Sequence, residues 1–322
     1  MLQLAIIGLG GWGRRLVDSV QGNSCGVRFS TAIVSRPDRS RSFGDTHNLR
    51  LSADLQMVLA DDKVDGVVSS GPAHLHAPHA LAALEAGKPV LAVKPMALTA
   101  PEAAALAAAA EKRGLLLALG YNRCFFPNVL EMRRRLRANA LGELLHTEGD
   151  FCVDRYLHIN PGNWKGDPNH VRAGSLADHM LYLTIETLGP IEEVHALGFD
   201  HHHTGNALAD TTAVLLRAAG RQSASLTAIG LTADYFRFQV FGTKGWIELR
   251  DASRFTFQPI EGEREELDLP AVDTEQAEVE AFAAAIRGEK TFPVPLTQAV
   301  HGVAVLEAIG RSAIERKPIL LG

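Results

Sequence analysis

The chain has 322 residues, of which 46% are hydrophobic and 21% charged, with a formal net charge of −5 and a pI near 6.2. This composition is typical of a globular protein of roughly two domains, and its negative charge argues against a surface that attracts nucleic acid. The three cysteines, Cys25, Cys124 and Cys152, lack the spacing of a metal site or a disulfide framework, so we expect a reducing, cytoplasmic location.

Short apolar runs alternate with helical patterns over the first 120 or so residues, as in parallel β-α-β units. Strands are predicted at Leu2–Ile7, Arg28–Val34, Val64–Ser70, Pro89–Val93 and Leu115–Leu119. Several of these lack polar alternation, as expected for strands covered on both faces. Helices are predicted at Trp12–Val20, Ala53–Ala60, His74–Ala86 and Ala100–Arg113. The last has a capping threonine at Thr99, a glutamate three residues on and a glycine after its end.

After Asn122 the strands alternate apolar and polar residues, which is typical of an antiparallel sheet with one exposed face. They are predicted at Leu144–Val153, Glu193–Phe199, Thr211–Arg217, Ser223–Ala228, Phe236–Phe241, Trp246–Arg250 and Phe255–Gln258. Helices are predicted at Pro127–Ala138, Ser175–Leu188, Thr274–Arg287 and Thr297–Arg316. The basic stretch Arg133–Arg137 is expected to form a solvated helix face.

We therefore predict an α/β protein of two domains. Residues 1–122 form a dinucleotide-binding Rossmann domain with a parallel sheet. Residues 123–322 form an α+β domain with a large, mostly antiparallel open sheet, and the C-terminal helix is able to pack back on the first domain. The apolar run that opens the chain is too short to span a membrane and leads directly into a motif, so it reads as a strand and not as a signal peptide.

That motif is a glycine loop, Gly8-Leu-Gly10-Gly-Trp-Gly13, between a predicted strand and a predicted helix. Gly8 permits a tight turn, Gly10 lets the backbone approach a pyrophosphate, and Gly13 lets the helix pack close to the strand. The helix N-terminus then offers free N–H groups to the phosphates. A dinucleotide site is the favoured interpretation; a tight turn without a ligand and an S-adenosylmethionine site are the alternatives.

The end of the second strand indicates which nicotinamide cofactor is bound. NAD enzymes usually carry an acidic residue there, whereas this chain has Ser35 and Arg36. A hydroxyl followed by a guanidinium suits a 2′-phosphate, so NADP is favoured over NAD. The alternative is that Arg36 is a surface residue at the start of a loop.

Three further stretches, Ser69–His76, Leu84–Pro95 and Gly174–Tyr182, resemble the GFO/IDH/MocA family of glucose–fructose oxidoreductase, inositol dehydrogenase and rhizopine-catabolism proteins. Asn163-Trp-Lys165 and Phe241–Leu249 resemble it too, so the resemblance covers nearly the whole chain in order. It implies an NAD(P)-dependent oxidoreductase acting on CH–OH groups of a sugar, cyclitol or similar polyhydroxy compound. It also implies a homodimer or homotetramer associating through the open sheet.

The resemblance also assigns residues. The family's Glu-Lys-Pro motif corresponds to Val93-Lys94-Pro95, which keeps the lysine that contacts the reacting oxygen but lacks the glutamate. Lys94 also follows an apolar strand, where ligands of α/β proteins bind. Cofactor contacts are further expected from Trp12, Ser70, Pro72, His76, Pro95 and Asn122. For His76, capping the following helix is an equal alternative.

Asp178 and Tyr182 lie four residues apart and hence on one helix face. Many family members have a proton-transferring histidine where this chain has Tyr182, so the resemblance makes Tyr182 the proton-transfer group and Asp178 the residue that positions substrate. His179 projects about a hundred degrees away from them. Free tyrosine has a pKa of roughly 10, which favours carbonyl reduction by the neutral phenol. A helix tyrosine packed against the sheet is the structural alternative.

Weaker candidates are Arg123, after the last Rossmann strand, and the loop residues Arg155, His158, Lys165 and His170. The His201–His203 run is expected to be a surface loop without a metal, because consecutive histidines rarely converge on one ion. Two other functions compete with the dehydrogenase hypothesis. One is a non-catalytic dinucleotide-binding regulator, and the other is a glycosidase that uses tightly held NAD without net redox change.

Overall fold

The computed structural model describes residues 1–24, 26–159, 163–167, 175–201 and 209–322. By its internal contacts the chain divides into unit 1, residues 1–122 and 273–300, and unit 2, residues 123–272 and 301–322. The predicted boundary after Asn122 coincides with this division. Residues 273–300, predicted in the second domain, group instead with unit 1, because their helix packs on the first helix and second strand of the chain.

Unit 1 is built on a six-stranded sheet in the order β3-β2-β1-β4-β5-β6, in which all neighbours are parallel. The strands are β1 (Leu2–Ile7), β2 (Val27–Ile33), β3 (Arg50–Ser52), β4 (Gly66–Ser69), β5 (Val90–Val93) and β6 (Leu117–Gly120). The strands β4, β5 and β6 are buried along their whole length, which explains their largely apolar sequences. The strand order reverses between β1 and β4, where ligands of such sheets bind.

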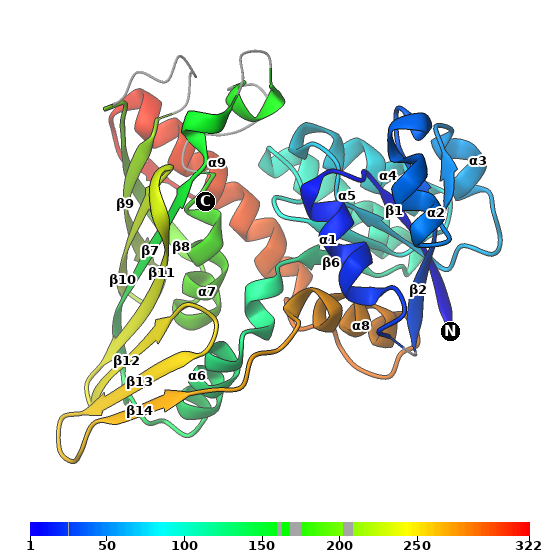
Figure 1. The fold of residues 1–322 in the computed structure, drawn as a ribbon. Coiled ribbons are helices and arrows are strands. Elements are labelled where there is room, and N and C mark those ends of the chain that lie inside the picture. The colour runs from blue at the N-terminus through cyan, green and yellow to red at the C-terminus, as the bar shows by residue number, and fades with distance from the viewer. Residues whose placement is uncertain (25, 160–162, 168–174, 202–208) are drawn as a thin grey trace. The chain divides into compact units, whose positions relative to one another are not determined.

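The helices of unit 1 are α1 (Gly11–Val20), α2 (Arg41–Thr46), α3 (Leu55–Leu59), α4 (His76–Glu85), α5 (Ala100–Arg113) and α8 (Thr274–Ile286). α1 packs against α8 and α4 against α5 (Figure 1). The predicted cap of α5 is present as a full capping box between Thr99 and Glu102. β3 and α2 were not predicted, because three and six residues are too few to show a periodicity.

Unit 2 contains a nine-stranded sheet in the order β14-β13-β12-β11-β7-β10-β9-β8-β15, antiparallel except between β7 and β10. The strands are β7 (Leu144–Asp154), β8 (Ile191–Phe199), β9 (Thr211–Ala218), β10 (Ser223–Ile229), β11 (Leu231–Gly242), β12 (Gly245–Arg250), β13 (Arg254–Pro259), β14 (Glu265–Asp268) and β15 (Ile319–Leu320). The last two were not predicted: β14 is exposed throughout and β15 has two residues.

The sheet of unit 2 is covered by helices on one face. α6 (Pro127–Arg137) and α7 (Asp178–Leu188) contact it, and Ser312 of α9 (Leu296–Glu315) accepts a 2.9 Å hydrogen bond from the amide of Ala196 on β8. Figure 1 shows α6 and α7 on the same side of the strands. The alternation on β9 agrees, since Val214 and Leu216 are buried whereas Leu215 is 61% exposed. Within the described ranges no helix is long and apolar enough to cross a membrane.

The basic stretch on α6 is only in part the solvated face that was predicted, since Arg134 and Arg137 are exposed whereas Arg133 and Arg135 are largely buried. Arg133 is largely buried and donates to both carboxylate oxygens of Glu186 on α7, at 2.5 and 2.8 Å, and to the carbonyl of Cys124. Arg135 pairs with Glu131 and Glu265. Arg133 therefore joins α6 to α7 through Glu186, and Arg135 joins α6 to β14 through Glu265.

Candidate active site

The carboxyl ends of the central strands of unit 1 lie side by side. Ile7 at the end of β1 pairs with Ile33 of β2 and with Ser69 of β4. The segments that follow these strands are the glycine loop, Ser35–Arg36 and Ser70–Pro72. Lys94 follows β5 in the same sheet. Ala92 of β5 pairs with Ser69 of β4, so the two strands end beside each other. The fold therefore gathers most of the predicted cofactor residues at one edge.

The glycine loop has the geometry of a dinucleotide cradle. Gly8 has φ +95°, and a side chain there would collide with the backbone of Gly71. A Cβ at Gly13 would lie 2.1 Å from the carbonyl oxygen of Gly8, whereas one at Gly10 would meet nothing within 4 Å. Two glycines are thus required by the fold, and the third leaves open space over the backbone.

The helix that follows the glycine loop, α1, has an N-terminus that can bind an anion. α1 has Gly10 as its N-cap, with no side-chain cap and no acidic residue in the first turn. Its first N–H groups and its dipole are therefore available to a phosphate. The residues present fit NAD(P): the loop would hold the pyrophosphate against α1.

The end of β2 carries the predicted cofactor-selecting side chains. Ser35 and Arg36 are both exposed, and within the described ranges the Arg36 guanidinium has no partner, whereas nearby Arg41 is bound to Asp38. Sequence reasoning missed Arg14. Its guanidinium donates to the carbonyl of Leu9 at 3.2 Å and lies 4.5 Å from the ring centroid of Phe43, so it spans the loop and α2. The one available signal was a cation directly after Gly13.

Three predicted cofactor residues use their polar side chains within unit 1. The Ser70 hydroxyl lies 2.9 Å from the carbonyl of Gly8 and 3.1 Å from that of Ile7. Asn122 donates to Thr274 and Glu275, both at 3.3 Å. His76 is buried between two backbone carbonyls and does not cap α4. The cofactor contacts predicted for these three residues stay predictions, and their polar side chains already bind groups within unit 1.

The other predicted residues of unit 1 are accessible. Trp12, Pro72 and Pro95 are each half-buried, and the guanidinium of Arg15 lies 5.5 Å from the Trp12 ring. Lys94 is half-buried at the carboxyl end of β5, and its amide donates to the carbonyl of Gly120 at 3.1 Å. The Lys94–Pro95 peptide bond is cis. Lys94 thus lies at the sheet edge where it was expected.

In unit 2, α7 carries Asp178 and Tyr182 one turn apart, 0% and 3% exposed. Asp178 is in the first turn, where the helix dipole favours a carboxylate. The Tyr182 ring packs on the backbone of α9: a Cβ at Gly302 would lie 2.2 Å from its Cε1 atom. His179 points elsewhere and stacks on Phe151 with ring centroids 4.0 Å apart. The predicted Asp–Tyr face therefore exists and excludes His179.

The weaker candidates have separate surroundings. Arg123 lies among the rings of Phe126, Phe151 and Phe236, at 5.0 to 5.7 Å from their centroids. His158 pairs with Asp154 at 3.1 Å. Burial, then the charge of Arg155, lower the pKa of Lys165. His170 lies outside the described residues.

The histidine run after β8 is described only in part. His201 binds Asp210 through its amide, at 2.6 Å, and through its Nδ1 atom, at 3.0 Å. His202 and His203 lie outside the described residues. In the part of the chain that the structure describes, no three metal-ligating side chains come together.

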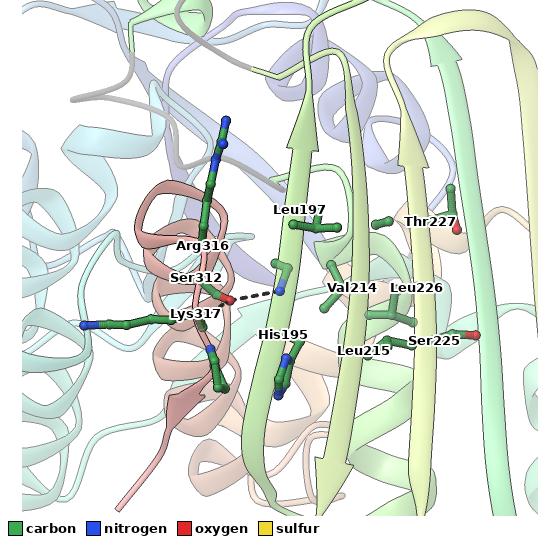
Figure 2. Close-up of a pocket in the computed structure, with 13 residues that line it drawn as sticks. His195, Leu197, Val214, Leu215, Ser225, Leu226, Thr227, Ser312, Arg316 and Lys317 are labelled. Carbon is green, nitrogen blue, oxygen red and sulfur yellow. Dashed lines mark hydrogen bonds between the residues drawn. The ribbon is translucent and has the colours of Figure 1, made fainter.

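A shallow pocket of about 450 Å³ lies elsewhere on unit 2, and Figure 2 shows it beside the end of α9. Its lining comes from β8, β9, β10, Ser312 and residues 316–318, and includes His195, Leu197, Leu215, Thr227, Arg316 and Lys317. Neither Asp178 nor Tyr182 lines it. This pocket is therefore separate from the Asp–Tyr face.

Two family models match the chain in succession. Residues 2–121 match the oxidoreductase family with an NAD-binding Rossmann fold, GFO/IDH/MocA, and residues 129–248 match a GFO/IDH/MocA C-terminal domain. The chain belongs to the GFO/IDH/MocA oxidoreductase family. The predicted resemblance and fold class are thus confirmed.

Similar proteins extend this family membership. An inositol 2-dehydrogenase of Saccharopolyspora erythraea is 33% identical over 161 residues, 48% of this chain and 46% of that protein. An uncharacterised oxidoreductase of Escherichia coli K12, YdgJ, is 26% identical over 318 residues, 90% of each chain.

Two solved structures share the fold over the whole chain. An oxidoreductase of Desulfitobacterium hafniense, described as NADPH-dependent, has a TM-score of 0.90 at 22% identity and covers 99% of this chain and 97% of that one. A levoglucosan dehydrogenase in complex with NADH and L-sorbose has a TM-score of 0.89 at 19% identity and covers 100% and 99%.

Proposed function

We propose that this family member transfers hydride between a nicotinamide cofactor and the CH–OH or carbonyl carbon of a sugar, cyclitol or related polyhydroxy compound. The observation that carries the proposal is the uncapped start of α1 under the open backbone of Gly10. The names of the inositol and levoglucosan dehydrogenases support the substrate class.

NADP is the favoured cofactor. Ser35 and Arg36 stand exposed at the end of β2, and a guanidinium without a partner in the described chain can bind a 2′-phosphate through two parallel hydrogen bonds. An acidic residue, which would favour the ribose hydroxyl of NAD, does not stand at this position. Among the related structures, one is described as NADPH-dependent and one contains NADH.

The nicotinamide, when bound, supplies the two electrons and the hydrogen that move as hydride. In the reductive direction, Tyr182 gives its phenolic proton to the carbonyl oxygen, which becomes the product hydroxyl. Lys94 donates a hydrogen bond to that oxygen and stabilises its developing negative charge. Asp178 accepts hydrogen bonds from neighbouring substrate hydroxyls and so orients the reacting carbon. Oxidation runs these proton movements in reverse, with Tyr182 as the base.

Two further properties are proposed with the function. Association into a homodimer or homotetramer is supported by the family resemblance and by the exposed apolar side chains Leu197 and Leu215 on the unit 2 sheet. A reducing, cytoplasmic location agrees with Cys124 and Cys152, which are buried and form no disulfide among the described residues.

Hydride transfer can be tested directly with deuterium. Purified protein is incubated with NADPH or NADH deuterated at the transferring position and with a panel of ketoses, aldoses, inosose and dicarbonyl compounds. Mass spectrometry then follows the label. Deuterium on carbon in a polyhydroxy product supports the proposal; binding of cofactor without label transfer to any compound class would favour the regulator alternative.

A further inference from the structure

His76 opens α4 and is only 3% exposed, and both of its ring nitrogens face backbone carbonyls. Nδ1 lies 2.8 Å from the oxygen of Pro95, and Nε2 lies 2.9 Å from the oxygen of Gly71. A protonated imidazole donates to both carbonyls, and a neutral one to a single carbonyl. The ring therefore forms a rigid connection between two segments that are distant in sequence.

Each of these segments supports a part of the candidate site. Pro95 directly follows Lys94, whose own amide is held on the other side by Gly120 at 3.1 Å. Gly71 follows β4 and lies under the glycine loop, since a Cβ at Gly8 would be 2.8 Å from the Cα of Gly71. His76 thus joins the floor of the glycine loop to the turn that carries Lys94.

The chemistry of this position is specific to imidazole. Burial lowers the pKa of His76, and the carbonyls of Pro95, Gly71 and Val93 act in the opposite direction. The nearby charges that it meets are those of His74 and His79 on the same segment. An apolar side chain of similar size would remove the imidazole N–H donor, which serves one carbonyl when the ring is neutral and both when it is protonated. His79, one turn along, makes no such bridge, since its Nδ1 has no partner among the described residues.

We propose that His76 is a positioning residue, which fixes the Lys94 turn relative to the glycine loop and thereby sets the place of the Lys94 ammonium at the sheet edge. This inference rests on the proposed function, in which Lys94 acts on the reacting oxygen.

The test measures Lys94 itself. Trace acetylation with acetic anhydride, quantified by peptide mass spectrometry, gives the labelling rate of Lys94 relative to Lys112, an exposed lysine on α5. The measurement is made without cofactor, with NADPH and with NADH, on the wild type and on the variants His76→Leu, His76→Gln and His79→Leu. Glutamine keeps one donor, leucine keeps none, and His79→Leu is the matched control on the same helix.

We expect the relative Lys94 rate to rise about fivefold in His76→Leu, because the turn opens locally, and to rise less in His76→Gln. We expect no change in His79→Leu. An unchanged rate in both His76 variants, or in His76→Gln alone should His76→Leu not fold, would overturn the inference. Failure of the proposed function looks different: neither NADPH nor NADH would then protect Lys94 in the wild type.

Discussion

The two units contribute different kinds of groups to the proposed site, backbone groups in unit 1 and side chains in unit 2. In unit 1 the proposed cofactor site is built from backbone, namely the glycine loop and the uncapped start of α1, and the buried side chains of Ser70 and His76 bind nearby backbone carbonyls. In unit 2 the proposed site depends on side chains instead, since Asp178 and Tyr182 are buried one turn apart on α7. A cofactor common to many enzymes can be held by main chain, whereas a particular substrate needs particular side chains.

The largest effect on kcat is expected from removing the phenolic oxygen of Tyr182, the proposed proton-transfer group. Tyr182→Phe removes only the phenolic oxygen, so kcat with the identified substrate should fall about 10²- to 10⁴-fold while cofactor affinity stays the same. Steady-state kinetics and cofactor titration measure the two quantities. A variant that keeps wild-type kcat would assign Tyr182 to packing and remove it from the mechanism.

A backbone site should respond to added atoms. Gly13→Ala places a methyl 2.1 Å from the Gly8 carbonyl, so we expect a loss of nucleotide binding together with overpacking that costs about 1–3 kcal/mol of unfolding free energy. Gly10→Ala is the matched variant, because its methyl meets no protein atom within 4 Å. It should keep the stability and lose only the binding. Equal NADPH affinity in Gly10→Ala and wild type would contradict the proposal that the glycine loop binds the pyrophosphate.

A buried carboxyl group in unit 1, that of Glu278, should make the stability of the fold depend on pH. Glu278 is fully buried on α8, and burial, then the nearby Glu275, raise its pKa well above the ordinary value, against the opposing effect of the Tyr121 amide. A raised folded pKa favours the fold when the group is protonated, so its cost is absent below about pH 4 and grows as pH rises toward the folded pKa.

Glu278→Gln should therefore raise the unfolding free energy at neutral pH by roughly 1–3 kcal/mol, and this gain should vanish below about pH 4. Denaturant unfolding at both pH values measures it. Glu275→Gln is the control with the opposite sign, because Glu275 accepts from Arg15 at 2.7 Å and from Thr274 at 2.9 Å. Loss of stability in Glu278→Gln at neutral pH would show that the carboxylate is ionised and bound.

A smaller effect tests how the Tyr182 ring is held. Gly302→Ala puts a methyl 2.2 Å from Cε1 of Tyr182 and should displace the phenol, lowering kcat about tenfold. Alanine also favours a helix over glycine by about 1 kcal/mol, so the thermal stability should not fall in proportion. Unchanged kcat with raised stability would mean that the ring adapts freely and that its position is not critical.

The sequence predicted more of unit 1 than of unit 2. The apolar strands and the glycine loop are local patterns, and α5 was predicted with its exact bounds because Thr99, Glu102 and Gly114 mark both ends. The contact of Tyr182 with Gly302 joins residues over a hundred positions apart and leaves no local pattern. Arg133 was misjudged for the same reason: a polar residue looks alike in sequence whether it faces solvent or a buried carboxylate. The cofactor contacts of Ser70 and His76 stay predictions, although both side chains bind backbone carbonyls.

The most direct test of the central claim is a fluorescence titration of NADPH and NADH against wild type and Arg36→Ala. We predict binding of both cofactors, with NADPH tighter, and a loss of about tenfold in NADPH affinity in Arg36→Ala while NADH affinity stays the same. Wild-type protein that binds neither cofactor would contradict the account, because the loop, α1 and the Lys94 turn would then serve another ligand.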